Sequence, residues 1–188
     1  MHRTIAYAVA VLILFVIYVG GISAAQDKPH QGKPAAHGMD MTMDDAHFGH
    51  MMAKHHQGGI EMAQLEEKAG ASAEMKQLAA KIRKGQQSEL PQLQAHGKRH
   101  KADPKMAEHE KHMQKEHAAT MSKLKAAKGA TLDKLFAEEM IKHHEQGLMM
   151  IEHTQFKDVQ LKGFAEKLAA NQKSELEALR NAMDRGTR

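Results

Sequence analysis

The sequence contains neither cysteine nor tryptophan. The lack of cysteine excludes disulfides, thiolate metal sites and a lipoprotein anchor. The chain also lacks a strong charge of one sign: when Arg3, which lies in a predicted export signal, is set aside, 26 basic and 23 acidic side chains remain. Such a mild excess, spread along the chain, does not indicate a nucleic-acid partner.

Long apolar runs are missing except near the N-terminus. Residues 5–19 form an apolar run that follows a short basic start and precedes Ser23, Ala24 and Ala25. This pattern predicts a secretory signal peptide over residues 1–25, cleaved after Ala25. An uncleaved membrane anchor is the alternative. Either interpretation predicts that the rest of the chain lies in the periplasm or another extracytoplasmic compartment.

Methionine and histidine are abundant, with 15 residues of each. The methionine content is roughly fourfold above an ordinary composition. Methionine is a flexible filler of apolar cores, which explains part of this excess. It does not explain the equal excess of histidine, so the two residue types together indicate a metal-binding function.

Composition divides the exported part into two regions. Residues 26–43 predict a disordered, Met/His-rich lead-in, because prolines and glycines interrupt them and no apolar period is present. Residues 44–184 have the apolar spacing of helices and no alternating, strand-like runs. We therefore predict an all-α domain over this second region.

The helical region contains an internal repeat. Residues 48–62 align with residues 136–150 at a constant offset of 88, and residues 78–90 align with residues 164–176 after a two-residue slip. Each unit predicts a helical hairpin, and two hairpins make a four-helix bundle. The repeat is the strongest indication of fold in the sequence.

Capping residues indicate where the helices begin and end. Asp44 or Asp45 is expected to start the first helix, and Gly70 to end it. Ser72 and Asp158 occupy equivalent places in the repeat and are expected to cap the second helix of each hairpin.

The two hairpins are separated by an insert. We predict a first hairpin over residues 44–97, an inserted helix within residues 98–129 and a second hairpin over residues 130–184, with Thr131 at its start. Pro104 is expected to begin the inserted helix. Pro91 predicts a kink or an early end of the helix that contains it.

Both units carry the motif Met-x-x-His-His-x-x-Gly. Its side chains share one strip of a helix, and such spacing offers two or three metal ligands, so a facing helix must complete the site or leave it open. The alternatives are that the methionines are only core residues and that the histidines have buried hydrogen-bond partners or are exposed. The predicted ligands are Met52, His55, His56, Met62, Met140, His143, His144 and Met150.

The hairpin register predicts which residues lie opposite the histidines. The first turn centres near residue 71, so His56 and positions near residue 86 lie at equal distances from it. The same count applies to the second hairpin. Four residues are therefore expected to hold the histidine tautomers as outer partners of a metal site: Gln86, Glu89, Gln172 and Glu175.

The residue three places before each histidine indicates which metal is bound. Iron and manganese bundles commonly use Glu-x-x-His, and this pattern does not occur in the chain. Methionine takes that place four times, at Met52, Met106, Met140 and Met150. Thioethers favour copper as Cu(I), or the equivalent Ag(I), while histidine also suits Cu(II).

Two further Met/His clusters are weaker candidates. One joins the lead-in to the first helix, where the alternative is a merely polar tail. The other follows one face of the inserted helix, where the alternative is an apolar face that docks on the bundle. The candidates are Met39, Met41, Met43, His47, His50, Met51, Met106, His109, His112, Met113, His117 and, after the second motif, His153.

The doubled motif resembles the family named domain of unknown function 305, a ferritin-like helical group, over about residues 44–184. The resemblance rests on the segments 52–59 and 140–147 and on Gln-x-x-Glu-Leu at residues 86–90 and 172–176. The Met/His-rich flanks are similar to exported members of the CopM type, which bind copper and assist copper tolerance. The resemblance implies ligand roles for Met52, His55, His56, Met140, His143 and His144. The long insert departs from the short connection common in the family.

We therefore expect an exported, non-catalytic protein that sequesters or hands on copper, mainly Cu(I), with metal ions and a copper-handling protein as partners. Neither nucleic acid nor, after signal cleavage, a membrane is expected. Two alternatives stay open. One is a ferritin-like, metal-dependent oxidase, although the sequence has no catalytic signature. The other is a helical scaffold that binds a partner protein.

Overall fold

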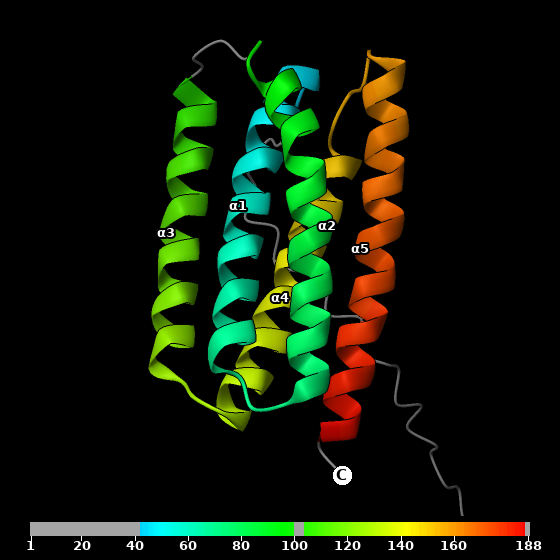
Figure 1. The fold of residues 1–188 in the computed structure, drawn as a ribbon. Helices are drawn as coiled ribbons and strands as arrows, with labels where there is room; N and C mark the ends of the chain where they lie inside the picture. The colour runs from blue at the N-terminus through cyan, green and yellow to red at the C-terminus, as the bar shows by residue number, and fades with distance from the viewer. Residues whose placement is uncertain (1–41, 100–103, 187–188) are drawn as a thin grey trace, which may run out of the picture. The chain divides into compact units, whose positions relative to one another are not determined.

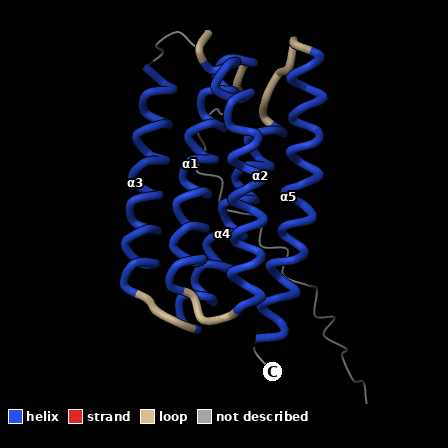
Figure 2. The backbone as a smooth tube through the Cα atoms, in the orientation of Figure 1, coloured by secondary structure: helices blue, strands red, loops and turns tan. Residues whose placement is uncertain are grey.

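The computed structural model describes residues 42–99 and 104–186, and within them it has five helices and no strand (Figures 1 and 2). The predicted all-α class, with two hairpins and one inserted helix, is confirmed. None of the described helices is long and apolar enough to cross a membrane. The predicted signal peptide lies outside the described residues. The helices are α1 (Asp45–Ala69), α2 (Ala73–Gly97), α3 (Pro104–Ala126), α4 (Ala130–Glu152) and α5 (Val159–Gly186).

The bundle is built from two hairpins, α1 with α2 and α4 with α5 (Figure 1). Helix α1 also packs against α4, and α2 against α5, which closes the four-helix arrangement. Helix α3 lies outside these four and contacts α1 and α4. The insert between the repeats therefore covers the line along which the two hairpins meet.

The predicted caps are present at the helix starts. Asp44, Ser72 and Asp158 each accept a hydrogen bond from the backbone N–H three residues later, at 2.9, 3.2 and 3.1 Å. Helix α1 stops before Gly70, as expected. These side chains satisfy backbone donors that have no partner within the helix.

Two expected boundaries differ from the structure. Of the two outcomes expected at Pro91, a kink or an early end, the early end does not occur, because α2 continues through Pro91 to Gly97. Pro91 is exposed, so the carbonyl that loses its N–H partner can bond to water, while the buried Leu93 keeps the following turn packed in the core. Helix α4 begins at Ala130 rather than Thr131, after Gly129, whose φ of 57° suits glycine.

Each hairpin holds the loop of the other. Asp133, in the first turn of α4, accepts hydrogen bonds from the backbone N–H groups of residues 71–72 at 2.7 and 2.9 Å. Asp45, in the first turn of α1, accepts from those of residues 157–158 at 3.1 and 3.0 Å. The two aspartates are equivalent in the repeat, so the arrangement is reciprocal.

The core has two apolar clusters with a polar layer between them. On α1, for example, Phe48 and Met52 belong to one cluster, Met62 belongs to the other, and two histidines lie between them. The other bundle helices repeat this order. The polar layer consists of His55, His56, Gln86, Glu89, His143, His144, Gln172 and Glu175.

Met43 belongs to the folded part rather than to a disordered lead-in. Its backbone N–H donates to the carbonyl of His153 at 3.2 Å, and its carbonyl accepts from Gln155 at 2.8 Å. Its side chain is buried in the same cluster as Phe48. The predicted lead-in over residues 26–43 therefore extends too far, because an apolar side chain and two backbone hydrogen bonds fix its last residue.

Candidate metal site

The two Met-x-x-His-His motifs meet at the contact between α1 and α4. Their rings form one row, with centroids 6.4 Å apart from His56 to His55, 3.6 Å from His55 to His143 and 6.2 Å from His143 to His144. The middle pair is stacked, at an interplanar angle of 24°. The repeat thus places its four motif histidines in a single group shared by both hairpins.

The stacked histidines bind each other's backbone. Nε2 of His55 lies 2.9 Å from the carbonyl oxygen of His143, and Nε2 of His143 lies 3.0 Å from that of His55. Because a carbonyl only accepts, both Nε2 atoms carry the proton. The Nδ1 atoms are buried and have no hydrogen-bond partner.

Both stacked rings are uncharged at neutral pH. Burial, followed by the nearby His56 and His144, lowers the pKa of His55 to about 3. Burial, followed by the adjacent His55, also holds the pKa of His143 well below its usual value. A neutral ring with its proton on Nε2 has a lone pair on Nδ1, which is the form that binds a metal ion.

The outer two histidines are held by glutamates. Nε2 of His56 donates to Glu89 at 3.0 Å, and Nε2 of His144 donates to Glu175 at 2.7 Å. These are the contacts that the hairpin register predicts. The Nδ1 atoms of this pair are also buried without a partner. All four rings therefore share one arrangement, with Nε2 fixed by an oxygen and Nδ1 without a partner.

The glutamines of the layer do not fix the rings. Neither Gln86 nor Gln172 makes a hydrogen bond to a histidine in the described part of the chain. Their amide oxygens instead lie against Gly59 and Gly147, where an added Cβ would be only 2.3 and 2.5 Å away. The motif glycines are therefore needed for space, and the predicted outer role holds geometrically for the glutamates alone.

The motif methionines lie on both sides of the histidine row. Met52 and Met150 are buried in one apolar cluster, and Met62 and Met140 in the other. Among the residues that the structure describes, no three His, Asp or Glu side chains lie close enough to hold a metal ion. A closed site must therefore include thioethers or move side chains, and the ligand roles of these methionines stay a prediction.

The weaker candidates are spread over the fold. Met43, Met51 and Met106 are buried in one apolar cluster. Four histidines among these candidates pair with acidic residues: His47 with Asp44 at 3.3 Å, His50 with Glu110 at 2.9 Å, His112 with Glu116 at 3.2 Å and His117 with Glu61 at 2.9 Å. His109 is half-buried, His153 is exposed, and Met39 and Met41 lie outside the described residues.

The sequence analysis did not predict two features of the structure, a cavity and a buried pair of carboxyl groups. One is a cavity of about 450 Å³ between α1, α3 and α4, whose lining includes Met113 and His117. The other is the fully buried Glu66 beside Asp133, where burial and then the shared hydrogen bond raise the pKa of Glu66 to about 8. The repeat contained one indication that Asp133 has a structural role, because Asp133 lies 88 residues after Asp45, the same offset that separates the two motifs.

Comparison with known proteins places this fold among solved structures. A family model described as domain of unknown function (DUF305) matches residues 45–183. A DUF305 protein from Streptomyces coelicolor, assigned as secreted, aligns with a TM-score of 0.66 and 20% identity over 76% of this chain and 93% of that one. A DUF305 fragment from Deinococcus radiodurans aligns with a TM-score of 0.60 and 18% identity over 75% and 95%.

A third solved structure is CopM in the Cu(II)-bound form. It aligns with a TM-score of 0.59 and 20% identity over 77% of this chain and 98% of that one. At these identities the likenesses establish the fold alone. No curated protein matches the sequence.

Proposed function

Because this chain belongs to the DUF305 family, we propose that it binds copper outside the cytoplasm and stores the metal or passes it on, without catalysing a reaction. One observation carries this proposal: four motif histidines whose Nε2 atoms are all occupied and whose buried Nδ1 atoms all lack a partner. Histidines that bind metals usually donate their second N–H to a carbonyl or carboxylate in this way.

The surrounding side chains favour a soft ion. The histidine row lies between two clusters that together contain all four motif methionines, and no carboxylate-rich group is available among the described residues. Thioether and imidazole donors suit Cu(I) and Ag(I), and imidazoles alone suit Cu(II). CopM, whose fold this chain shares, is known in a Cu(II)-bound form, which supports copper as the metal.

The extracytoplasmic location has two supports. The N-terminal pattern predicts an export signal, and the related Streptomyces coelicolor protein is assigned as secreted. Outside the cytoplasm, a chain without cysteine can neither form disulfides nor lose thiolate ligands to oxidation. Methionine and histidine are therefore suitable copper ligands for that compartment.

The proposal is tested with protein that begins at Gln26, titrated with Cu(I) without oxygen against a chromophoric Cu(I) chelator. The unaltered chain is expected to take up at least one Cu(I), and the variant His55→Gln with His143→Gln to bind at least about tenfold more weakly. A matched control, His109→Gln with His112→Gln, changes two histidines of α3 and is expected to bind normally.

Two results would count against the proposal. The first is a folded, unaltered chain that takes up no copper. The second is full, tight binding by the His55/His143 variant, since the paired rings are then not ligands. Thermal melts followed by circular dichroism establish that each variant is folded.

A further inference from the structure

The cavity between α1, α3 and α4 lies against the stacked histidines. Its lining includes His55 and His143 from the bundle and Met113 and His117 from α3. Met62, on α1, lines the same cavity. Two thioethers and three imidazoles from three helices therefore line one partly open cavity.

His117 repeats the arrangement of the bundle histidines. Its Nε2 lies 2.9 Å from the Oε2 atom of Glu61, a carboxylate oxygen that accepts the ring proton. Its Nδ1 faces α1 and lies 3.0 Å from the position that a Cβ on Gly58 would take. The ring is thus oriented from outside, and the nitrogen that can bind a metal points inward.

Helix α1 is shaped to receive this histidine. Gly58 aligns with Gln146 in the repeat, whereas the following Gly59 and Gly147 are the same in both units. A side chain at residue 58 would take the place of the His117 ring, whereas Gln146, at the equivalent place in α4, lines the same cavity with its side chain present. The repeat therefore departs from its own pattern at the point where α3 inserts a possible ligand.

Consecutive glycines of α1 bring two of the rings near each other. The ring of His117 lies against Gly58, and a Cβ on Gly59 would lie only 2.9 Å from Cε1 of His143. Helices α1 and α3 run in the same direction, since Glu110 contacts His50 and His117 contacts Glu61. Met113 precedes His117 by one helical turn and Met62 follows Gly58 by one turn, so the two thioethers flank the His117 ring from opposite sides.

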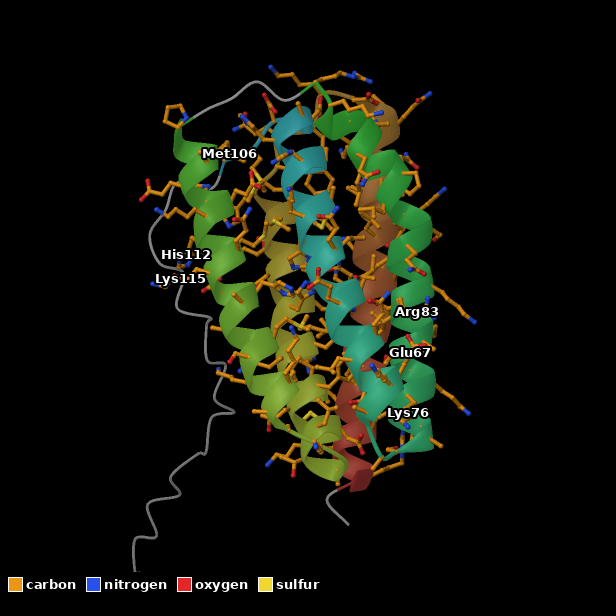
Figure 3. The ribbon with its side chains drawn as sticks, turned by 60° about the vertical axis from the view of Figure 1, so that its left-hand side comes forward. Glu67, Lys76, Arg83, Met106, His112 and Lys115 are labelled. Carbon is orange, nitrogen blue, oxygen red and sulfur yellow. The ribbon has the colours of Figure 1, made fainter. Side chains whose placement is uncertain are left out.

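The ends of α3 are fixed, while its middle spans the cavity. Met106 near one end and Met121 and Leu124 near the other are buried in the two apolar clusters. Figure 3 shows His112 and Lys115 on the side of α3 that points away from the bundle. Helix α3 is therefore held near both ends, and Met113 adds a contact with the apolar cluster that contains Met106.

We propose that this cavity binds one soft monovalent metal ion, Cu(I) or Ag(I), and that α3 supplies Met113 and His117 to a site completed by Met62 and the paired histidines. The proposal rests on the copper-binding function, because His55 and His143 serve both. Thioethers are required here, since three close His, Asp or Glu side chains do not occur in the described residues. Acidic and basic side chains both line the cavity, so the donor atoms select the ion.

The test compares two variants of α3 in the protein that begins at Gln26, loaded with Cu(I) or Ag(I) without oxygen. Met113→Leu with His117→Gln removes the donors that face the cavity. Met121→Leu with His112→Gln removes the same residue types elsewhere on the helix. The first variant is expected to lose one metal equivalent or to bind it at least about tenfold more weakly, and X-ray absorption should show fewer sulfur neighbours around copper. The second should match the unaltered chain in both measurements.

A third variant, Gly58→Gln, introduces the residue of the other repeat and displaces His117 without removing a donor. It is expected to weaken the same site, so the proposal is testable even if the double variant folds poorly. If the unaltered chain binds no Cu(I), the copper-binding function fails as well. If it binds Cu(I) and both Met113/His117 and Gly58 variants retain affinity and sulfur coordination, only the role of α3 is overturned.

Discussion

Two carboxyl groups lie together in the interior, where Glu66 is fully buried beside Asp133. Both side-chain oxygens of Asp133 accept hydrogen bonds from backbone N–H groups of the loop between α1 and α2. Burial, followed by the neighbouring Asp133, disfavours the charged form of Glu66, so the pKa of Glu66 rises to about 8. The folded chain therefore keeps a buried proton beside this loop.

This proton makes stability fall as the pH rises. Below the ordinary value of 4.5, Glu66 is protonated in both folded and unfolded chains. Between 4.5 and about 8 the unfolded chain releases the proton while the folded chain keeps it, so folding stability decreases over this window. This loss of stability is on the order of 2–5 kcal/mol. We expect Glu66→Gln to abolish it, because an amide does not titrate.

Urea unfolding followed by circular dichroism, at pH values spanning this window, measures the effect. The adjacent Glu67, which pairs with Arg83 at the surface, is the control, and Glu67→Gln should leave the pH dependence unchanged (Figure 3). A Glu66→Gln variant that loses stability towards alkaline pH as steeply as the unaltered chain would contradict the assignment.

At the scale of the helix, close approach of backbones decides the packing of α1 on α2. Gly49 lies at the crossing, where an added Cβ would be 2.7 Å from the backbone nitrogen of Gly97 and 2.9 Å from the carbonyl oxygen of Leu93. Backbone atoms cannot move aside as a flexible side chain can. The crossing therefore requires glycine, although glycine lowers helix propensity.

Gly49→Ala is expected to lower the free energy of unfolding by about 1–3 kcal/mol, because the helices must separate. Gly163→Ala in α5 is the matched control, since nothing lies within 4 Å of its added Cβ. That variant should be up to about 1 kcal/mol more stable, as the gain in helix propensity has no opposing clash. Equal effects of the two substitutions in denaturant titrations would refute the crossing argument.

The sequence predicted the helices and their pairing because these depend on local spacing. The apolar period, the capping residues and the repeat located the five helices, and the turn at residue 71 placed Gln86 opposite His56, with Glu89 one turn further on. The cavity and the Glu66–Asp133 pair depend instead on how separate helices dock, which no spacing along one helix reports. The boundary at Met43 was missed for the same reason, since its partners lie more than a hundred residues away.

At the scale of the molecule, the hairpins are interlocked by Asp45 and Asp133, each of which caps the loop of the other hairpin. The backbone N–H groups of residues 71–72 and 157–158 therefore find their acceptors in the other hairpin. The two units should therefore lose structure together rather than one after the other, as expected of a single cooperative domain.

Asp45→Ala is expected to destabilise the whole bundle by about 1–2 kcal/mol, since it removes hydrogen bonds from a charged acceptor to both loop N–H groups. Hydrogen exchange should then rise in α1 and α2 as well as around residues 155–160. The neighbouring Asp44→Ala, which removes the cap of α1 and the pair with His47, should raise exchange mainly in the first turn of that helix. Faster exchange restricted to the α4–α5 loop in Asp45→Ala would show that the hairpins open independently.

The stacked pair of His55 and His143 also bears on the ancestry of the chain. One hairpin alone has only half of the histidine row, and each ring needs the other hairpin's carbonyl to hold its proton. A single-repeat ancestor would have gained this arrangement only as a homodimer, with the two histidines facing each other across its symmetry axis. Within one fused chain the two halves need not stay identical, and they differ where Gly58 stands opposite Gln146 in the repeat.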